Sequence, residues 1–383
     1  MSEVLLKDIT ELIVDCPHST AYDEGKGFPL VRTPNIGKGR LIYSGMHRVS
    51  EEVYNQRNAR AVPQEDDLIF AREATAGNVA LIQKGEKVCL GQRTVLIRPD
   101  KTKVDPAYLT YTLLAPKQQY NLLSTANGAT VAHVNLPTIR NLKLDIPNIE
   151  TQHCIAAILS RYDSLIENYQ KQIKLLEEAA QRLYKEWFVD LHFPGHENAK
   201  IVDGVPEGWV KKPVDSIYSI KYGKNLSTKL ITADGDYPVY GANGVIGYYD
   251  KANCNEQVVL ITSRGNGSGD VLMTYHKDAF ITNNSFIVIP FNEYDYCQLP
   301  FTYQFLKNAN FRSVRTGAAQ PQLTNQSIHT VDVVLPQKDI IVKYCKRTLR
   351  SNDVIIHLKN QIRLLTEARD RLLPKLMSGE IAV

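Results

Sequence analysis

Two sets of residues have the types and spacing of a catalytic or nucleotide site. Asp15, Glu24 and Lys26 are similar to the two acids and one lysine that some nucleases use. The segment "GNGSG" from Gly265 to Gly269 has the glycine spacing of a nucleotide-binding loop. No apolar helix pattern follows that loop, and the acidic set lies in a strongly polar stretch. We therefore interpret both sets as chance matches and predict no catalytic residue.

Metal-binding side chains are present but poorly arranged. Cys16 lies close to His18, and His192 lies close to His196. A Pro-Gly pair separates the second pair of histidines and prevents the helical i, i+4 arrangement that a zinc site would use. The six cysteines are scattered without a CxxC pair, so they indicate neither a zinc knuckle nor a disulfide framework. We predict no metal site and no bound cofactor.

A larger group of polar side chains suits contacts with DNA. Arginine can bind guanine through two hydrogen bonds and Asn or Gln can do so with adenine, while Lys and Gly amides suit phosphate. The glycine loop "SRGNGSGD" would let the backbone approach a ligand closely. Taken singly, each such residue is more often solvated surface. The candidate DNA contacts are Arg32, Asn35, Lys38, Arg40, Arg72, Lys224, Tyr240, Asn243, Arg264, Asn266, Arg312 and Arg315, with Asn284, Gln320 and Gln322 as further suitable side chains.

Charge and hydropathy narrow the class of protein. There are 45 Lys and Arg against 41 Asp and Glu, a net charge of +4 that permits a nucleic-acid partner without requiring one. The chain has 383 residues, which suggests two to four domains. No apolar run is long enough to cross a bilayer, and the first residues lack the core of a signal peptide. We expect a cytoplasmic protein without a membrane partner.

The elements that must position these residues occur twice. "QIKLLEEAAQRL" (Gln172–Leu183) returns as "QIRLLTEARDRL" (Gln361–Leu372), with eight of twelve positions identical and a shift of 189 residues. The same shift places Ile139 on Ile328. Further upstream "CLGQRTVLIRP" from Cys89 resembles "FITNNSFIVIP" from Phe280. The chain therefore consists of a variable domain and a helix, followed by a second variable domain and a second helix.

Both repeated helices carry an apolar seam. Its positions step by four and three, which is the pattern of coiled-coil pairing, and the first seam spans roughly 50 Å. Pro374 is expected to end or kink the second helix. We predict that the two helices pack on each other, with the alternative that each lies on its own globular domain. The predicted pairing residues are Ile166, Tyr169, Ile173, Leu176 and Leu183 in the first helix and Ile355, Leu358, Ile362, Leu365 and Leu372 in the second.

The remaining segments predict short strands and loops. They are runs of Val, Ile, Tyr and Phe broken by Gly, Asn, Asp and Pro. The expected boundaries are a first recognition domain at 1–150, a helical spacer at 151–190, a second recognition domain at 191–336 and a C-terminal helical spacer at 337–383. An antiparallel helix pair would relate the halves by a pseudo-two-fold axis. Duplex DNA has local two-fold symmetry too, so the repeat suggests a reader of two unlike half-sites separated by a fixed gap.

Several peptides resemble the specificity subunits of type I restriction–modification systems. The resemblance covers essentially the whole chain. "FPLVRTPNIGKGRL", "YPVYGANGVIGYYD" and the loop "SRGNGSGD" are similar to stretches of their target-recognition domains. "RLYKEWFVDL" after the first helix and "LPKLMSGEI" near the C-terminus are similar to the segments that close the two repeats of the family. The order and spacing of these peptides make the match specific.

The resemblance implies a fold and a set of partners. The fold would be α+β, with two α/β target-recognition domains separated by two long helices that form an antiparallel coiled coil. Each domain would read one half of a bipartite double-stranded DNA site. The helices would set the gap and bind two methyltransferase subunits, and the assembly would recruit restriction subunits. S-adenosylmethionine, ATP and Mg²⁺ would bind to those partners, leaving this chain without chemistry of its own.

Two other classes of function stay open at this point. A nuclease or methyltransferase fused to its own recognition domains would need an N-P-P-Y/F motif or a P-loop, and the sequence contains neither. A stand-alone DNA-binding regulator derived from such a subunit would need no enzyme partner, and the sequence does not distinguish it from the lead hypothesis.

Overall fold

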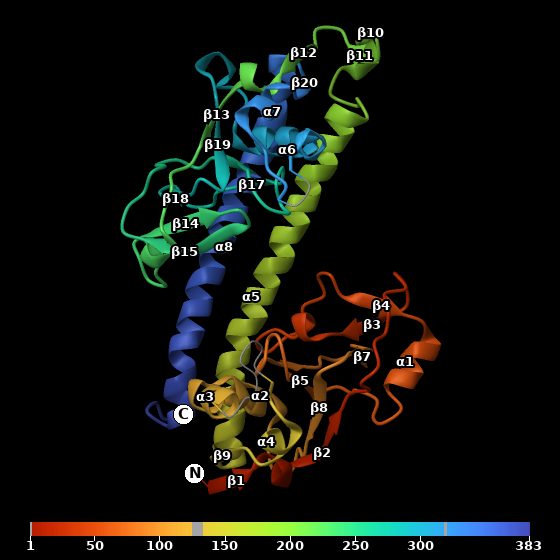
Figure 1. Ribbon diagram of the computed structural model, residues 1–383, viewed down its shortest axis with the longest axis vertical. Helices are drawn as coiled ribbons and strands as arrows, with labels where there is room; N and C mark the ends of the chain where they lie inside the picture. Colours follow the sequence, from red (N-terminus) through yellow and green to blue (C-terminus); the bar gives the residue numbers. More distant parts are fainter. Residues whose placement is uncertain (1, 125–132, 318–319) are drawn as a thin grey trace. The chain divides into compact units, whose positions relative to one another are not determined.

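The computed structural model describes residues 2–124, 133–317 and 320–383 (Figure 1). Two compact units emerge from its contacts. Unit 1 comprises Met1–Glu167 with Leu364–Val383, and unit 2 comprises Asn168–Arg363. Two long helices, α5 (Ile149–Tyr184) and α8 (Lys338–Ser378), each contribute to both units. The long apolar seams predicted from the sequence therefore do form long helices.

Unit 1 is built on two small sheets and one further strand pair. Its strands are β1 (Ser2–Leu5), β2 (Thr10–Asp15), β3 (Phe28–Val31), β4 (His47–Val49), β5 (Leu68–Ala71), β6 (Val79–Leu81), β7 (Cys89–Leu90), β8 (Thr94–Pro99) and β9 (Lys143–Ile146). One sheet has the order β2-β8-β5-β6, the other has the order β4-β3-β7, and β1 pairs with β9. Strand β5, "LIFA", is buried at every residue, as expected for an apolar strand covered on both faces.

Short helices pack around the sheets of unit 1. They are α1 (Glu51–Arg57), α2 (Pro106–Leu114), α3 (Pro116–Ser124) and α4 (Leu136–Arg140). The Asp105 carboxylate accepts a hydrogen bond from the Tyr108 amide and Pro106 opens α2, which together define the start of that helix. The core of unit 1 includes Ile155 and Leu159 of α5 and Leu376 of α8. Both long helices are therefore part of one hydrophobic core.

Unit 2 repeats the strands of unit 1. Its strands are β10 (Ile201–Val202), β11 (Val205–Pro206), β12 (Val210–Pro213), β13 (Tyr218–Tyr222), β14 (Tyr237–Gly241), β15 (Gly244–Tyr249), β16 (Val259–Thr262), β17 (Val271–Met273), β18 (Phe280–Ile281), β19 (Ser285–Pro290) and β20 (Asp332–Leu335). Its short helices are α6 (Leu299–Asn308) and α7 (Asn325–His329).

The two units share one sheet topology. The order β13-β19-β16-β17 matches β2-β8-β5-β6, the order β15-β14-β18 matches β4-β3-β7, and β12-β20 matches β1-β9. Even the mixed pairing is repeated, because β14 runs parallel to β18 as β3 runs parallel to β7. The internal repeat predicted from the sequence is thus a repeat of the fold, although the loops differ in length and composition.

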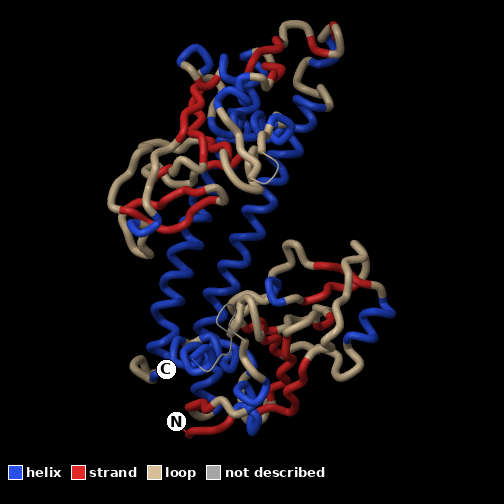
Figure 2. Tube along the Cα trace, in the orientation of Figure 1, coloured by secondary structure: helices blue, strands red, loops and turns tan. Residues whose placement is uncertain are grey.

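The long helices lie side by side in unit 2 (Figure 2), and two contacts there give their relative direction. The Tyr344 hydroxyl donates to the Ala180 carbonyl at 3.2 Å. The Lys359 ammonium lies 3.1 Å from the Glu177 carboxylate. Residue numbers on α8 therefore rise as those on α5 fall, which is the antiparallel order. One cluster in unit 2 brings together six of the predicted seam residues: Tyr169, Ile173, Leu176, Ile355, Leu358 and Ile362.

The other predicted seam residues lie on the same helices. Leu183 packs against the core of unit 2 and Leu372 against the core of unit 1. Ile166 is buried and Leu365 is half-buried, both in unit 1. The seam of unit 1 thus continues the pattern seen in unit 2.

Pro374 does not end the second helix, contrary to one alternative predicted from the sequence. Helix α8 continues through Pro374 to Ser378. Leu373 and Met377 pack against the core of unit 1, and Leu376 is buried within it. The packing of this last turn offsets the hydrogen bond that proline cannot donate.

A buried polar cluster joins the two helices in unit 1. The Asp163 carboxylate accepts a hydrogen bond from the Tyr111 hydroxyl of α2 at 2.6 Å, and Arg369 of α8 donates to its other oxygen at 2.6 Å. Asp163 and Arg369 side chains are only 6% and 15% exposed. Burial, reinforced by the Asp163 carboxylate, raises the pKa of the Tyr111 phenol, so its proton stays in place to bind Asp163.

Loss of this arginine should destabilise unit 1 strongly. We expect Arg369→Ala to lower the free energy of unfolding by about 3–5 kcal/mol, because it leaves the Asp163 carboxylate buried without its cation. Denaturant unfolding followed by circular dichroism measures the change. Arg371→Ala is the matched control, since that side chain is 79% exposed and pairs only with Glu367 on its own helix; it should cost at most about 0.5 kcal/mol. Equal losses in both variants would contradict a special role for the buried pair.

Candidate nucleic-acid interface

The glycine loop of unit 2 connects β16 to β17 and is held tightly. Gly265 and Gly269 have φ values of +82° and +89°, which glycine adopts without strain. The Gly269 amide donates to the Thr262 carbonyl at 2.8 Å. A Cβ at Gly269 would lie 3.1 Å from the Arg312 amide nitrogen. Glycine at position 269 thus lets the loop lie directly against the turn that carries Arg312.

Exposed polar side chains gather around this loop. Arg312 donates to the Asp270 carboxylate at 3.0 Å, and Arg315 donates to the Asn266 carbonyl at 3.4 Å. Arg264 forms a β-bridge with Gln322. Arg264, Asn266 and Gln322 are exposed. The structure therefore brings together four candidates that are separate in sequence (Arg264, Asn266, Arg312 and Arg315), and we call them, with Gln322, the glycine-loop cluster.

The hairpin of β14 and β15 reaches the same loop. Asn243 is exposed at its turn, and a Cβ at Gly267 would lie 3.3 Å from the Asn243 Oδ1. The Thr262 hydroxyl donates to the Ala242 carbonyl at 2.7 Å, which ties the hairpin to the end of β16. Lys224 is exposed as well, next to a β-bridge between its backbone and Thr282. Asn243 thus adds a base-binding amide beside the glycine-loop cluster.

Tyr240 has a structural role instead of a free hydroxyl. It is only 2% exposed. Its oxygen accepts a hydrogen bond from the Tyr275 amide at 3.0 Å and lies 2.9 Å from the His276 Nδ1. Burial raises the pKa of Tyr240 to about 12. The structure therefore gives this predicted DNA contact a different role, that of anchoring the segment after β17.

Arg72 of unit 1 is likewise used inside the fold. It is 8% exposed, and its guanidinium donates to the Asp15 carboxylate at 2.7 Å and to the Val134 carbonyl at 3.0 Å. A third contact, at 2.9 Å, joins Arg72 to the His133 Nε2. Since a guanidinium can only donate, the His133 Nε2 must accept this hydrogen bond. The proton of the neutral imidazole therefore sits on Nδ1, which faces Glu73. Sequence reasoning selected Arg72 for its charge and missed this internal network.

One exposed arginine of unit 1 was missed by the sequence analysis. Arg93 is paired with Glu73 and its side chain is 62% exposed. Ala71 pairs with Thr94 in unit 1 as Thr262 pairs with Ser285 in unit 2, so Arg93 occupies the position of Asn284. The aligned segments beginning at Cys89 and Phe280 already place Arg93 opposite Asn284. Because Asn284 was a candidate DNA contact, this alignment could have identified Arg93.

A shallow cavity of about 330 Å³ lies beside Arg93. Arg32, Thr33 and Gln92 contribute to its lining. The Arg32 guanidinium donates to the Gly45 carbonyl at 3.0 Å, which leaves part of the group facing the surface. Arg32, Gln92 and Arg93 form the polar surface of unit 1, which we call the Arg93 surface.

The other candidates of unit 1 are divided between loop support and exposure. Asn35 is 2% exposed, and its amide accepts from the Arg32 backbone and donates to the Ile42 carbonyl. Arg40 is half-buried, with its Nε 3.8 Å from a carboxylate oxygen of Glu167. Lys38 is exposed. Asn35 thus shapes the loop that presents Lys38 and Arg32.

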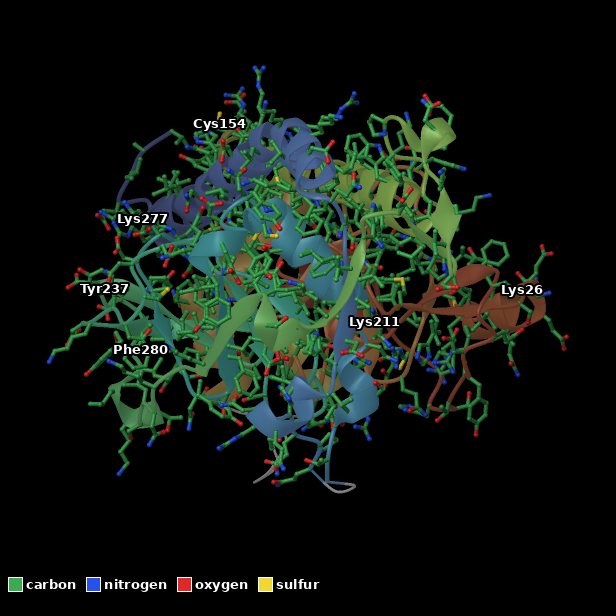
Figure 3. All side chains as sticks on the ribbon, turned by 90° about the horizontal axis from the view of Figure 1, so that it is seen from above. Lys26, Cys154, Lys211, Tyr237, Lys277 and Phe280 are labelled. Atoms are coloured by element: carbon green, nitrogen blue, oxygen red, sulfur yellow. The ribbon has the colours of Figure 1, made fainter. Side chains whose placement is uncertain are left out.

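The residues considered for catalysis do not share a site. Asp15 pairs with Arg72, whereas Glu24 accepts a hydrogen bond from the Ser50 hydroxyl. Lys26 lies on an exposed loop of unit 1 (Figure 3). Among the residues that the structure describes, no group of three or more His, Cys, Asp or Glu side chains is placed to hold a metal ion. No helix in the described ranges is long and apolar enough to cross a membrane.

The known proteins similar to this chain are specificity subunits of type I restriction systems. The chain is 25% identical to the type I restriction enzyme MjaIX specificity subunit of Methanocaldococcus jannaschii over 99% of this chain and 93% of that protein. The HindI specificity subunit of Haemophilus influenzae is 23% identical over 75% of this chain and 80% of its own. The crystal structure of the type I restriction–modification S subunit from M. genitalium has a TM-score of 0.60 at 18% identity, covering 98% and 95% of the two chains.

The family model agrees with the repeat. The type I restriction modification DNA specificity domain matches residues 2–178 and again residues 206–364. These two matches cover the duplicated strands and reach into both long helices. Together with relatives that match along nearly the whole chain, they show that this chain belongs to the family of type I restriction–modification specificity subunits.

Proposed function

We propose that this chain reads a bipartite, gapped DNA site, with unit 1 recognising one half and unit 2 the other. The observation that carries the proposal is the repeated fold with unlike side chains at equivalent positions. Arg93 in unit 1 stands where unit 2 has Asn284. One scaffold with two different sets of donors and acceptors suits two different base sequences.

Within each unit we assign base reading to the exposed and half-buried polar side chains at the surface. In unit 2 these are the glycine-loop cluster and Asn243, and in unit 1 the Arg93 surface with Lys38. Arginine and Asn or Gln side chains offer the bidentate donors and acceptors that distinguish guanine and adenine in the major groove. Asn35, Arg72 and Tyr240 support this surface from inside and are not part of the proposed contact.

We further propose that α5 and α8 set the gap and bind two methyltransferase subunits, which in turn recruit restriction subunits. Both helices contribute residues to both units, so their length would fix the separation of the two readers. Chemistry is assigned to the partners, with S-adenosylmethionine, ATP and Mg²⁺ bound there, because the sequence contains neither a methyltransferase N-P-P-Y/F motif nor a P-loop.

The experiment that tests this function is adenine methylation mapping of the host genome by single-molecule sequencing, with and without the gene. Loss of one gapped, asymmetric motif on deletion is the expected result and gives both half-sites at once. An unchanged pattern with the gene expressed would argue for a stand-alone DNA-binding regulator. Methylation or cleavage of DNA by the purified chain alone would overturn the non-catalytic assignment.

A single substitution should alter one half of the motif. We expect Arg264→Ala to weaken methylation of the wild-type motif and relax one base of one half-site, at a cost of about 1–3 kcal/mol in binding. Motif mapping of the variant strain measures the change. Lys211→Ala is the control, because Lys211 pairs with Asp332 in the separate β12–β20 sheet and should leave the motif unaltered. Changes in both half-sites would contradict the assignment of one reader to each unit.

Shortening the helices should alter the gap. Removal of four residues from the middle of both α5 and α8 shortens the spacer by roughly 6 Å, nearly two base-pair rises of about 3.4 Å. The methylated motif should then lose about one or two base pairs of gap and keep both half-sites. Motif mapping again provides the readout, and altered half-site bases with an unchanged gap would show that the helices do not set the spacing.

A further inference from the structure

The duplication creates an ambiguity in helix pairing. Gln172–Leu183 of α5 and Gln361–Leu372 of α8 are nearly the same sequence. A seam that fits α8 should therefore almost fit a second α5 from another copy of the chain. Something in the sequence must make α5 select α8, since apolar residues common to both helices cannot discriminate between them.

Among the described contacts within each unit, an ion pair joins the two helices in unit 1 and another joins them in unit 2. Asp163 of α5 binds Arg369 of α8 at 2.6 Å in unit 1. Glu177 of α5 binds Lys359 of α8 at 3.1 Å in unit 2, and the Lys359 ammonium also lies 3.4 Å from the centre of the Tyr275 ring. In both pairs the acid is on α5 and the base is on α8.

The repeat does not preserve these charges. A shift of 189 residues places Asp163 on Asn352 and Arg369 on Ala180. The same shift places Glu177 on Thr366 and Lys359 on Gln170. Each charged member of these two pairs thus has an uncharged residue at its repeated position.

The geometry of unit 2 supports this correspondence for the buried pair. Asn352 and Ala180 line one small cavity of about 30 Å³ together with Gln304 of α6. Asn352 and Ala180 are the repeated positions of Asp163 and Arg369. The Gln304 Oε1 is buried, and the described residues supply no hydrogen-bond partner for it. In unit 1 the Arg369 side chain occupies this position and donates to Asp163. In unit 2 the short side chain of Ala180 leaves a cavity there.

We propose that Asp163 and Arg369, assisted by Glu177 and Lys359, are positioning residues that make α5 pair with α8 and reject a second copy of α5. In an α5–α5 pair of the same geometry, Asp163 would face Ala180 and remain buried without a cation. In an α8–α8 pair, Arg369 would face Asn352. Only the α5–α8 pair joins each buried charge to its opposite.

The test uses two full-length copies with different affinity tags, expressed together, and measures the fraction of one tag that co-purifies with the other. Light scattering then gives the mass of the recovered species. The levelled variant is Asp163→Asn with Arg369→Ala. Both helices then carry Asn at the repeated position 163/352 and Ala at the repeated position 180/369. We expect exchange between copies to rise about tenfold or more over the wild type. Unchanged exchange would overturn the proposal.

Two further variants separate pairing selectivity from simple stabilisation. The swapped variant, Asp163→Arg with Arg369→Asp, keeps one complementary pair and should exchange as little as the wild type. The doubled variant adds Ala180→Arg and Asn352→Asp to the wild-type pair, so α5–α5 and α8–α8 contacts become complementary too. We expect more exchange between copies than in the wild type, despite the added ion pair. If the ion pairs only stabilised the α5–α8 contact, exchange would fall instead.

These outcomes do not depend on DNA binding, so their failure is distinct from failure of the proposed function. If the levelled variant does not fold, the doubled variant decides, because it retains Asp163 and Arg369. Exchange at or below the wild-type level in the doubled variant would then overturn the proposal.

Discussion

The hydrophobic contact between α5 and α8 is the interaction on which the rest of the molecule depends. The core of unit 1 is completed by Ile155 and Leu159 from α5 and Leu376 from α8. The core of unit 2 contains Tyr184 from α5, Trp187 from the π-helical turn Lys185–Val189 that follows it, and Tyr344 from α8. The main core of each unit thus includes residues from both helical segments. Removing apolar surface from water therefore couples the folding of each recognition domain to the pairing of the helices. This coupling also explains how Pro374 can lie inside a helix.

The repeated sheets provide one scaffold on which different loops are held. Strand pairing fixes where β5 ends and β8 begins in unit 1 and where β16 ends and β19 begins in unit 2, so the flanking residues emerge at equivalent points. Unit 1 stabilises its loop by an ionic network around Arg72, while unit 2 does so by close packing of glycines against the Arg312 turn. Rigid strands with variable loops allow the surface chemistry to change while the fold is kept.

The candidate DNA residues show how well side-chain type alone predicts which residues lie on the proposed DNA-binding surface. Arg264, Asn266, Arg312 and Arg315 were selected for chemistry alone, and the fold brings them together around one loop. Arg72 and Tyr240 satisfy the same chemical criterion but are buried, with hydrogen bonds to Asp15 and to the Tyr275 amide. Arg93 was missed because its exposure depends on the end of β8 and on Glu73, which is distant in sequence but close in space. Burial of a polar side chain is decided by its tertiary neighbours, which no local pattern reports.

The sequence by itself determined the internal repeat, the two long helices, their seam and the family, because periodicity and duplication are properties of the chain that need no coordinates. The tertiary structure alone decided the strand order, the continuation of α8 past Pro374 and the division of polar residues between core and surface. It also revealed that the charges joining α5 to α8 are absent from their repeated positions. These features depend on which groups meet across long separations in sequence, where the balance of desolvation and hydrogen bonding selects one arrangement.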